Sequence, residues 1–281
     1  MRRTPRRIVH TTDDRTVGRA AEELAGGWER IGQLFSRRQV LRGALSGAGA
    51  AAMGAAGLLG PGEARADKAV QTGKFIFPRL KFSVYDGTPD IWNVGPSGDV
   101  ILRKKLAELT NMNVSLEPKV VLLADFDEMV LHPFVFMTSE GYFRLPEKEL
   151  ANLREFLERG GFIFSDDCVF ANKEDRFFRC FRKMLDELFP DNPMRHIPDD
   201  HEIYHIYYDF GKSCSPHMQG VRMHDGKPGA WGLFEPGTGR IMTYLDPGDL
   251  HCGWMCRYWG MPKNIEAIKM GINVIIYFLS H

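Results

Sequence analysis

The stretch Phe134–Asp167, FVFMTSEGYFRLPEKELANLREFLERGGFIFSDD, decides the fold class. It begins with Phe134–Met137 and ends with Phe162–Phe164 before its final polar residues, and both are short, fully apolar runs of the kind that a parallel sheet buries on both faces. Between them, Pro146 opens an amphipathic helical segment that a double glycine closes. A strand, a crossover helix and a second strand in this order predict two parallel strands of one sheet.

The same alternation continues on both sides of this stretch. Apolar spacing predicts strands over 74–84, 113–123 and 239–244, and helices over 97–109, 177–189 and 265–279. Pro78 in the first strand predicts a sheet edge or a bulge. The sequence therefore predicts an α/β domain with a mainly parallel sheet, whose ligand site lies at the carboxyl ends of the strands.

The segment before this domain has the features of an export signal. Arg37 and Arg38, in SRRQVLRG, precede an apolar, Gly/Ala-rich run of about 16 residues, shorter than the roughly 20 that a membrane-spanning helix needs. Ala64-Arg65-Ala66 then offers a small-x-small cleavage pattern. We expect 1–66 to be a twin-arginine signal peptide, cleaved after Ala66 during export by the twin-arginine machinery to the bacterial periplasm, and 67–281 to form a single α/β domain. A retained N-terminal anchor is the alternative.

Charge and hydropathy argue against a nucleic-acid partner and against a membrane span after the signal segment. The chain holds 36 Lys and Arg against 36 Asp and Glu. The signal segment has more Arg than acidic residues, so the remainder is mildly acidic, and it lacks a Lys/Arg stripe with interleaved aromatics. We therefore expect no nucleic-acid partner. No second apolar run is long enough to span a bilayer after cleavage.

Cysteine pairing stays open at the level of the sequence. The five cysteines all follow Ala66 and would meet an oxidising compartment, where disulfides persist. An odd number leaves at least one unpaired. Cys252 and Cys256 are close enough to pair locally, and a thiolate metal site is the alternative, although C-x-x-x-C is no strong zinc signature. The five are Cys168, Cys180, Cys214, Cys252 and Cys256.

Reactive side chains gather after two of the predicted strands. Asp166 and Asp167 follow one strand, and adjacent carboxylates need a metal, a helix N-terminus, or loop amides with a nearby Arg. Capping of the following segment is the structural alternative. The loop Leu245–Trp254 follows another strand and holds Asp249, His251 and Cys252; its structural alternative is a turn with a buried Trp.

Two nucleophiles can be examined at these strand ends. Ser139 lacks the glycine two residues earlier that a nucleophile elbow requires, because Met137 stands there. Cys168 has no identifiable activating base. The sequence thus predicts neither a serine nor a cysteine nucleophile.

His201–His205, HEIYH, matches the H-E-x-x-H pattern of zinc proteases. On a helix the two imidazoles share one face and one zinc, and Glu202 polarises the bound water. The run continues with β-branched and aromatic residues, which favours a strand, where residues four apart are separated by about 13 Å. A looser metal site with His201 and His205, and ordinary polar contacts, both remain open.

Several segments together resemble the bacterial domain-of-unknown-function family 4159. They are 132–168, 177–210 and 240–254, followed by a closing Gly-Ile-Asn-Val-Ile-Ile-Tyr helix, and the resemblance spans roughly 75–279. The family is grouped with the class I glutamine amidotransferase-like folds, which implies a three-layer α/β/α sandwich. No activity comes with the resemblance.

The resemblance also bears on the site residues. Glu202 stands where the family usually has Pro, so the zinc-protease interpretation weakens, and Ser139-Glu140-Gly141 stands where Gly-His-Gly is usual. The amidotransferase Cys nucleophile is not identifiable. The positions that match the family's polar residues imply a shared ligand pocket formed by Asp166, Asp167, Asp249 and Trp254.

Two functional hypotheses follow, and whether the protein is an enzyme stays open. The first is a non-catalytic periplasmic module that binds a small ligand or a protein partner on a scaffold without its nucleophile. The alternative is a metal-dependent hydrolase that uses His201, His205, strand-end carboxylates and a divalent metal such as zinc. We also predict Asp167, Asp249 and one of the two histidines within about 10 Å of each other in one cleft.

Overall fold

The computed structural model describes residues 73–83, 91–169, 174–211 and 215–281. The chain divides into two units, 1–48 and 49–281, and every described residue belongs to the second. The predicted signal peptide with its cleavage site, and Cys214, lie outside the described residues.

The described part is built on a seven-stranded sheet with the order β2-β1-β3-β4-β9-β8-β5. The five strands from β2 to β9 in this order are parallel, whereas β8 is antiparallel to both of its neighbours. This confirms the prediction of a mainly parallel sheet. The strands are β1 (Pro78–Lys81), β2 (Lys119–Leu122), β3 (Phe134–Ser139), β4 (Phe162–Asp167), β5 (Arg195–His196), β8 (Trp231–Phe234) and β9 (Ile241–Asp246), with β6 (Met223–His224) and β7 (Lys227–Pro228) in a separate hairpin.

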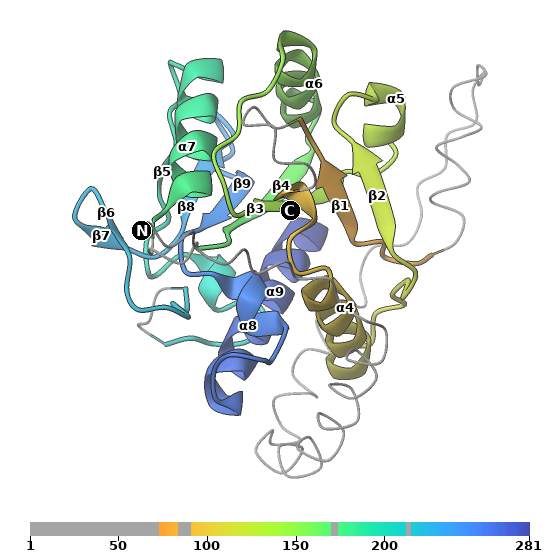
Figure 1. The fold of residues 1–281 in the computed structure, drawn as a ribbon, viewed down its shortest axis with the longest axis vertical. Coiled ribbons are helices and arrows are strands. Elements are labelled where there is room, and N and C mark those ends of the chain that lie inside the picture. The colour runs from red at the N-terminus through yellow and green to blue at the C-terminus, as the bar shows by residue number, and fades with distance from the viewer. Residues whose placement is uncertain (1–72, 84–90, 170–173, 212–214) are drawn as a thin grey trace, which may run out of the picture. The chain divides into compact units, whose positions relative to one another are not determined.

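Helices cover both faces of the sheet. In Figure 1, α5, α6 and α7 lie on one side, and α4, α8 and α9 lie on the other. The protein is therefore a three-layer α/β/α sandwich, as expected. The helices are α4 (Ser97–Leu109), α5 (Phe126–Met129), α6 (Glu147–Glu158), α7 (Arg176–Leu188), α8 (Leu250–Trp254) and α9 (Met261–Ser280), with short 3₁₀ turns η1 (Ile91–Asn93) and η2 (Glu202–Tyr204).

Apolar runs form the centre of the sandwich. Every residue of β3, β4 and β9 is buried, because helices pack on both faces of these strands. The ring of Phe134 stacks on that of Phe162 with centroids 5.8 Å apart, and it also meets Phe278 of α9. Burial of aromatic side chains of this size dominates core energetics.

Three local predictions differ from the structure. Pro78 is not at a sheet edge, because β1 lies between β2 and β3; it is the first residue of its strand, where proline is tolerated. The predicted strand 113–123 is divided into a bridge at Val114 and the strand β2, and Pro118 falls in the gap. The loop 245–254, predicted as a turn, contains the helix α8.

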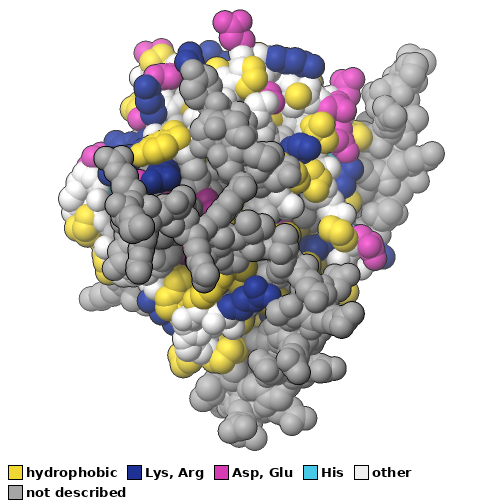
Figure 2. All heavy atoms as spheres, viewed as in Figure 1, with side chains coloured by type: hydrophobic (Ala, Val, Ile, Leu, Met, Phe, Trp, Pro, Cys, Tyr) yellow, Lys and Arg dark blue, Asp and Glu magenta, His cyan; other side chains and the backbone are white. Residues whose placement is uncertain are grey.

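Within the described ranges, no helix is both long and apolar enough to cross a membrane. The described part of the face in Figure 2 shows Lys and Arg interspersed with Asp and Glu. This mixed pattern agrees with the composition, which gave no basic stripe.

Candidate functional site

Four aspartates meet at the carboxyl edge of the sheet. Asp166 and Asp167 end β4, and Asp246 ends the neighbouring parallel strand β9 directly opposite Asp166. Asp249 then forms the N-cap position of α8. All four side chains are fully buried. The structure thus brings Asp166, Asp167 and Asp249 to one edge.

Asp166 caps the helix α8. Its two carboxylate oxygens accept hydrogen bonds from the backbone N–H groups of Leu250 (2.8 Å) and His251 (3.0 Å). Burial raises the pKa of Asp166 well above its ordinary value, and the charges of Asp246 and Asp249 add to this rise. Both oxygens are satisfied, so Asp166 positions α8 and has no free oxygen for a ligand.

Asp246 is a further buried carboxylate, which the sequence did not single out. It accepts hydrogen bonds from the Ser215 hydroxyl, from the Tyr244 hydroxyl (3.1 Å) and from the backbone N–H of Gly248 (2.6 Å). Burial raises its pKa to about 6. These contacts close the turn between β9 and α8.

Asp167 and Asp249 are only half satisfied. One oxygen of Asp167 accepts the Phe178 N–H (3.1 Å), and one oxygen of Asp249 accepts from Gln219 Nε2 (2.6 Å). The second oxygen of each is buried without an N–H or O–H donor among the described residues; the Cys252 thiol is the polar group beside Asp249. Burial raises the pKa of Asp249 to about 7 and that of Asp167 well above its ordinary value.

Two cysteines lie beside these carboxylates. Cys168 follows β4, Cys252 belongs to α8, and their Sγ atoms are 3.5 Å apart. The hydrogen bond with Cys252 lowers the pKa of Cys168, but burial and the nearby charges of Asp249, Glu140 and Asp166 together outweigh it and raise that pKa to about 12. In the described part of the chain the free thiols are Cys168, Cys180, Cys252 and Cys256.

The suggested local pairing of Cys252 with Cys256 is therefore not what the structure shows. The Cys252 side chain points towards Cys168, because α8 lies against the end of β4 through the Asp166 cap. Sequence proximity favoured the wrong partner for this thiol.

His251 of α8 belongs to a separate buried network. Arg79 of β1 donates from Nε and Nη2 to the two carboxylate oxygens of Asp99 in α4, at 2.8 and 2.5 Å. The same Nη2 lies 2.9 Å from His251 Nε2, which is 3.3 Å from Asp99. Burial alone would raise the pKa of Asp99, but Arg79 and the hydrogen bonds hold it at about 2. The network joins β1, α4 and α8, and its histidine is fully buried.

The helices α4 and α8 lie in close contact at Gly98. A Cβ atom at this position would lie 2.9 Å from the carbonyl oxygen of His251 and 2.8 Å from its Nε2. We expect Gly98→Ala to lower the free energy of unfolding by about 1–2 kcal/mol in chemical denaturation, because the backbone clash outweighs a helix-propensity gain of about 1 kcal/mol.

Gly260→Ala is the matched control for this substitution. A Cβ at Gly260 would have its nearest neighbour at 3.9 Å, and the backbone φ of −61° suits alanine. Gly260 is the N-cap of α9, where alanine is less favourable than glycine, so the control should lose less than about 1 kcal/mol. Equal stability of the two variants would contradict the close approach of α4 and α8.

Trp254 is part of the core between α8, α9 and the sheet. Its side chain is fully buried, its indole N–H donates to the Ala267 carbonyl (2.9 Å), and its ring packs against Phe136 and Phe164. It anchors α8 to α9 and to the sheet.

His201 and His205 lie at the other edge of the sheet. The His201 ring is 5.7 Å from that of Tyr277, whose hydroxyl accepts the N–H of Ile241, the first residue of β9. Asp249 follows the last residue of this six-residue strand, so the length of β9, about 17 Å, separates them. The predicted cluster of Asp167, Asp249 and a histidine is therefore not formed.

Asn273 of α9 explains the placement of the two histidines. Its side chain is buried and bonds to Ile203 O, Tyr208 O and Tyr208 N, so α9 holds the segment around η2 away from the carboxyl edge. The H-E-x-x-H letters lie on a 3₁₀ turn, neither the strand nor the α-helix considered. His205 Nδ1 instead lies 2.8 Å from Asp209 Oδ1.

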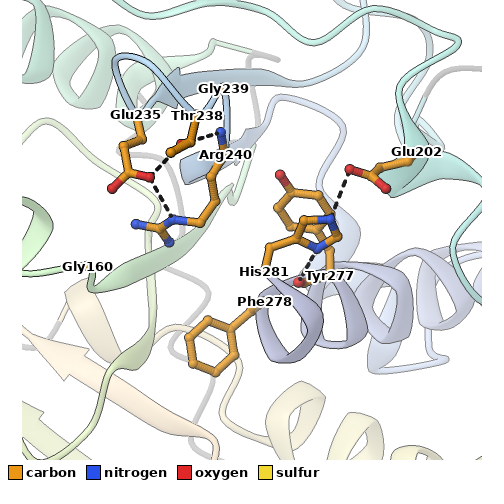
Figure 3. A pocket seen from close by; sticks show the side chains of 9 residues that line it. All are labelled: Gly160, Glu202, Glu235, Thr238, Gly239, Arg240, Tyr277, Phe278 and His281. Carbon is orange, nitrogen blue, oxygen red and sulfur yellow. Dashed lines mark hydrogen bonds and ion pairs between the residues drawn. The ribbon is translucent and has the colours of Figure 1, made fainter. Parts of the chain in front are cut away.

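A cleft of about 630 Å³ lies on the same side as these histidines. It is lined by residues that precede β4 and β9, such as Gly160 and Arg240, and by the last turn of α9 (Figure 3). Its charged groups pair with each other: Arg240 with Glu235, and His281 with Glu202 (3.0 Å). None of the aspartates at the carboxyl edge lines it.

Ser139 ends β3 and is fully buried. Its hydroxyl donates to Gly141 O and accepts from Gly141 N, both at 3.1 Å, which closes a tight turn. Such a serine stabilises the end of a strand.

Comparison with known families gives one identification. The model of the family described as Domain of unknown function (DUF4159) matches residues 77–279. The chain belongs to this family. The description names no activity, and comparison with curated proteins returns no match. The matched region begins next to β1 and ends in α9, so it includes both the carboxyl edge and the Arg79 network.

Proposed function

We propose that this DUF4159 chain is an exported periplasmic domain that binds a cationic ligand at the carboxyl edge of its sheet and does not transform it. The observation that carries the proposal is the pair Asp167 and Asp249, each fully buried with one oxygen that no N–H or O–H group satisfies. A buried polar atom without a partner costs about 1–3 kcal/mol, and more when it is charged. A bound cation would offset that cost.

The surrounding charges support a cationic ligand. Among the described residues, neither Asp167 nor Asp249 forms an ion pair within 4.0 Å; Arg222, whose charge lowers the pKa of both, pairs with Asp175 at 2.7 Å. An anion would meet buried carboxylates here. An ammonium group or a metal ion would meet carboxylate oxygens that no N–H or O–H group satisfies.

The two candidate nucleophiles of the carboxyl edge, Ser139 and Cys168, are not activated, which supports binding without chemistry. The Ser139 hydroxyl is committed to the Gly141 turn, and the pKa of the Cys168 thiol is about 12, so little thiolate exists at neutral pH. His251, the histidine nearest in sequence to this edge, bonds to Arg79 and Asp99 inside the core. The hydrolase hypothesis needs His201 and His205 beside the carboxylates, and the length of β9 separates them.

Thermal-shift measurements test the ligand site. Metal chlorides and small amines are added to the parent, to Asp167→Asn/Asp249→Asn and to the control Asp191→Asn, which changes an exposed carboxylate. A binding cation should raise the melting temperature of the parent and of the control, and the double variant should lose that shift.

The ligand-free double variant gives a second readout. Neutral amides cost less to bury than carboxylates, so it should melt a few °C above the parent, since about 1 kcal/mol corresponds to roughly 2–4 °C at this size. Destabilisation of the ligand-free double variant would mean that the two carboxylates serve the fold, and the proposal would fail.

Labelling with a fluorophosphonate reagent tests the absence of a serine nucleophile. The folded protein should remain unlabelled, because Ser139 is buried and its hydroxyl closes a turn. Trypsin labelled in parallel shows that the reagent is active. Stoichiometric labelling at Ser139 would overturn the non-catalytic proposal.

A further inference from the structure

Three potential metal-binding side chains converge at the carboxyl edge. The ligand atoms of Cys168, Asp249 and Cys252 all lie within 4.8 Å of one another, and all three residues are buried. They come from two elements, the end of β4 and the start of α8, which the Asp166 cap holds together. The arrangement is thus fixed by the fold.

The spacing of the two sulfurs suits one tetrahedral ion. Thiolates at about 2.3 Å from a zinc are about 3.8 Å apart in tetrahedral geometry. The Sγ atoms of Cys168 and Cys252 are 3.5 Å apart, so a small adjustment would bring both to that distance. Zinc accepts both thiolate and carboxylate ligands, and thiolates exclude Mg²⁺ and Ca²⁺.

The carboxylate supplies an independent pointer to a ligand. Asp249 is fully buried, and its Oδ1 lacks an N–H or O–H donor, with the Cys252 thiol beside it. Its other oxygen accepts from Gln219 Nε2 at 2.6 Å, the kind of contact that orients a metal-bound carboxylate. Gln219 thus holds one oxygen of Asp249, and the carboxylate has an oxygen within 4.8 Å of both sulfurs.

We propose that Cys168, Cys252 and Asp249 hold a zinc ion, with the fourth position open to water or to a donor atom of a bound molecule. Three protein ligands leave one position of a tetrahedral zinc for water or for a donor atom of the bound molecule. This inference rests on the proposed function, because it names the cation that the carboxyl edge binds.

A Cys168–Cys252 disulfide is the competing use of the same thiols. It would require the sulfurs to approach from 3.5 Å to about 2.05 Å, and it would leave Asp249 Oδ1 without its thiol neighbour. Zinc accounts for all three residues, whereas a disulfide accounts for two.

Cobalt substitution tests the site on the purified full-length chain. The protein is stripped with a chelator under reducing conditions, and Co²⁺ is then added. We expect one equivalent with a sulfur-to-cobalt charge-transfer band and tetrahedral d–d bands, both lost when one equivalent of Zn²⁺ displaces the cobalt. Mass spectrometry under non-denaturing conditions should count one zinc.

Matched variants assign the ligands. Cys168→Ser and Cys252→Ser should each remove most of the charge-transfer intensity, whereas Cys180→Ser and Cys256→Ser, which change the other two described thiols, should leave it intact. Asp249→Asn should keep the sulfur band and weaken zinc binding at least 10-fold. Gln219→Leu should weaken it about 10- to 100-fold as an orienting contact. Circular dichroism must show that each variant is folded.

The outcomes separate this inference from the proposed function. It is overturned if folded parent protein binds no cobalt or zinc, if Cys180→Ser or Cys256→Ser abolishes the band, or if Asp249→Asn binds zinc as tightly as the parent. Peptide mapping that finds a Cys168–Cys252 disulfide with no metal uptake after reduction overturns it too. If zinc fails but an amine shifts the melting temperature through Asp167 and Asp249, the binding function stands without the metal; if both fail, both are wrong.

Discussion

Asp99→Asn is expected to lower the free energy of unfolding at neutral pH by about 3–5 kcal/mol, because it leaves the buried Arg79 charge without its partner. Arg79 is 3% exposed, so water does not replace the lost carboxylate. The guanidinium would keep the carbonyl oxygens of Trp92 and Val94, the His251 ring and one amide oxygen, but it would lose its negatively charged partner. Urea denaturation followed by circular dichroism measures the loss.

The pH dependence of stability shows whether the charge of Asp99, and not only the shape of its side chain, stabilises the fold. The pKa of this carboxyl is about 2 in the folded protein and 3.8 when unperturbed, so its contribution is complete above about pH 4 and is lost as the pH falls towards 2. The stability difference between the parent and Asp99→Asn should therefore be constant from pH 7 to pH 5 and shrink below pH 4.

An exposed carboxylate provides the control for this experiment. Asp127 lies on the surface in α5, and Asp127→Asn should change stability by less than about 0.5 kcal/mol. A loss below 1 kcal/mol for Asp99→Asn at pH 7, or a difference that is as large at pH 2 as at pH 7, would mean that the ion pair does not hold α4 to β1 as described.

Much of the fold could be predicted from the sequence, because the central strands can be recognised from their own residues. Every position is apolar in two of these runs, Phe134–Met137 and Phe162–Phe164. A strand needs apolar side chains on both of its faces only when helices cover both faces of the sheet. The antiparallel extension of the sheet by β8 and β5 was missed. Trp231–Phe234 is short and carries a glycine, and β5 has only two residues, too few to show a period.

The helix α8 illustrates a limit of local patterns. Its five residues contain a glycine and follow Asp-Pro-Gly-Asp, which reads as a turn. Its first N–H groups are satisfied by Asp166, which is 84 residues earlier in the chain. A helix that depends on a cap from another strand cannot be recognised from its own residues.

Topology placed part of the site, and local motifs misplaced the rest. The meeting of Asp166, Asp167 and Asp249 follows from two parallel strands that end at one edge, which the alternation of elements predicts. The proximity of the Cys168 and Cys252 thiols depends on β4 and β9 being neighbours in the sheet, which was not predicted. Cys256 is nearer to Cys252 in the sequence and therefore suggested the wrong neighbour. The H-E-x-x-H pattern led to a similar error, because it suggested histidines beside the carboxylates. Asn273 of α9 determines where that segment lies.

Export provides the second large expected effect. Residues 36–66 lie outside the described part of the chain, so periplasmic export remains a proposal that rests on Arg37, Arg38 and the run that follows them. We expect Arg37→Lys/Arg38→Lys to abolish export almost completely, with the uncleaved precursor in the cytoplasm, because the receptor reads the paired guanidinium groups and not only their charge. Cell fractionation and immunoblotting measure the two pools.

The chain contains its own control for this experiment. Arg6 and Arg7 form another adjacent pair upstream, and Arg6→Lys/Arg7→Lys conserves charge without touching the SRRQVLRG segment. This control should be exported and processed after Ala66 like the parent. Normal periplasmic accumulation of Arg37→Lys/Arg38→Lys, or equal failure of both double variants, would remove the basis of the localisation.

The same fractionation links export to the fold. The twin-arginine route carries chains that have already folded, so a zinc ion bound by Cys168, Asp249 and Cys252 in the cytoplasm would travel with the protein. Asp99→Asn keeps the signal intact and weakens the folded state, and it should therefore reach the periplasm in smaller amounts than Asp127→Asn. If the two variants are exported equally while Arg37→Lys/Arg38→Lys is retained, the signal is read without regard to folding, and the folded-state argument for this route is wrong.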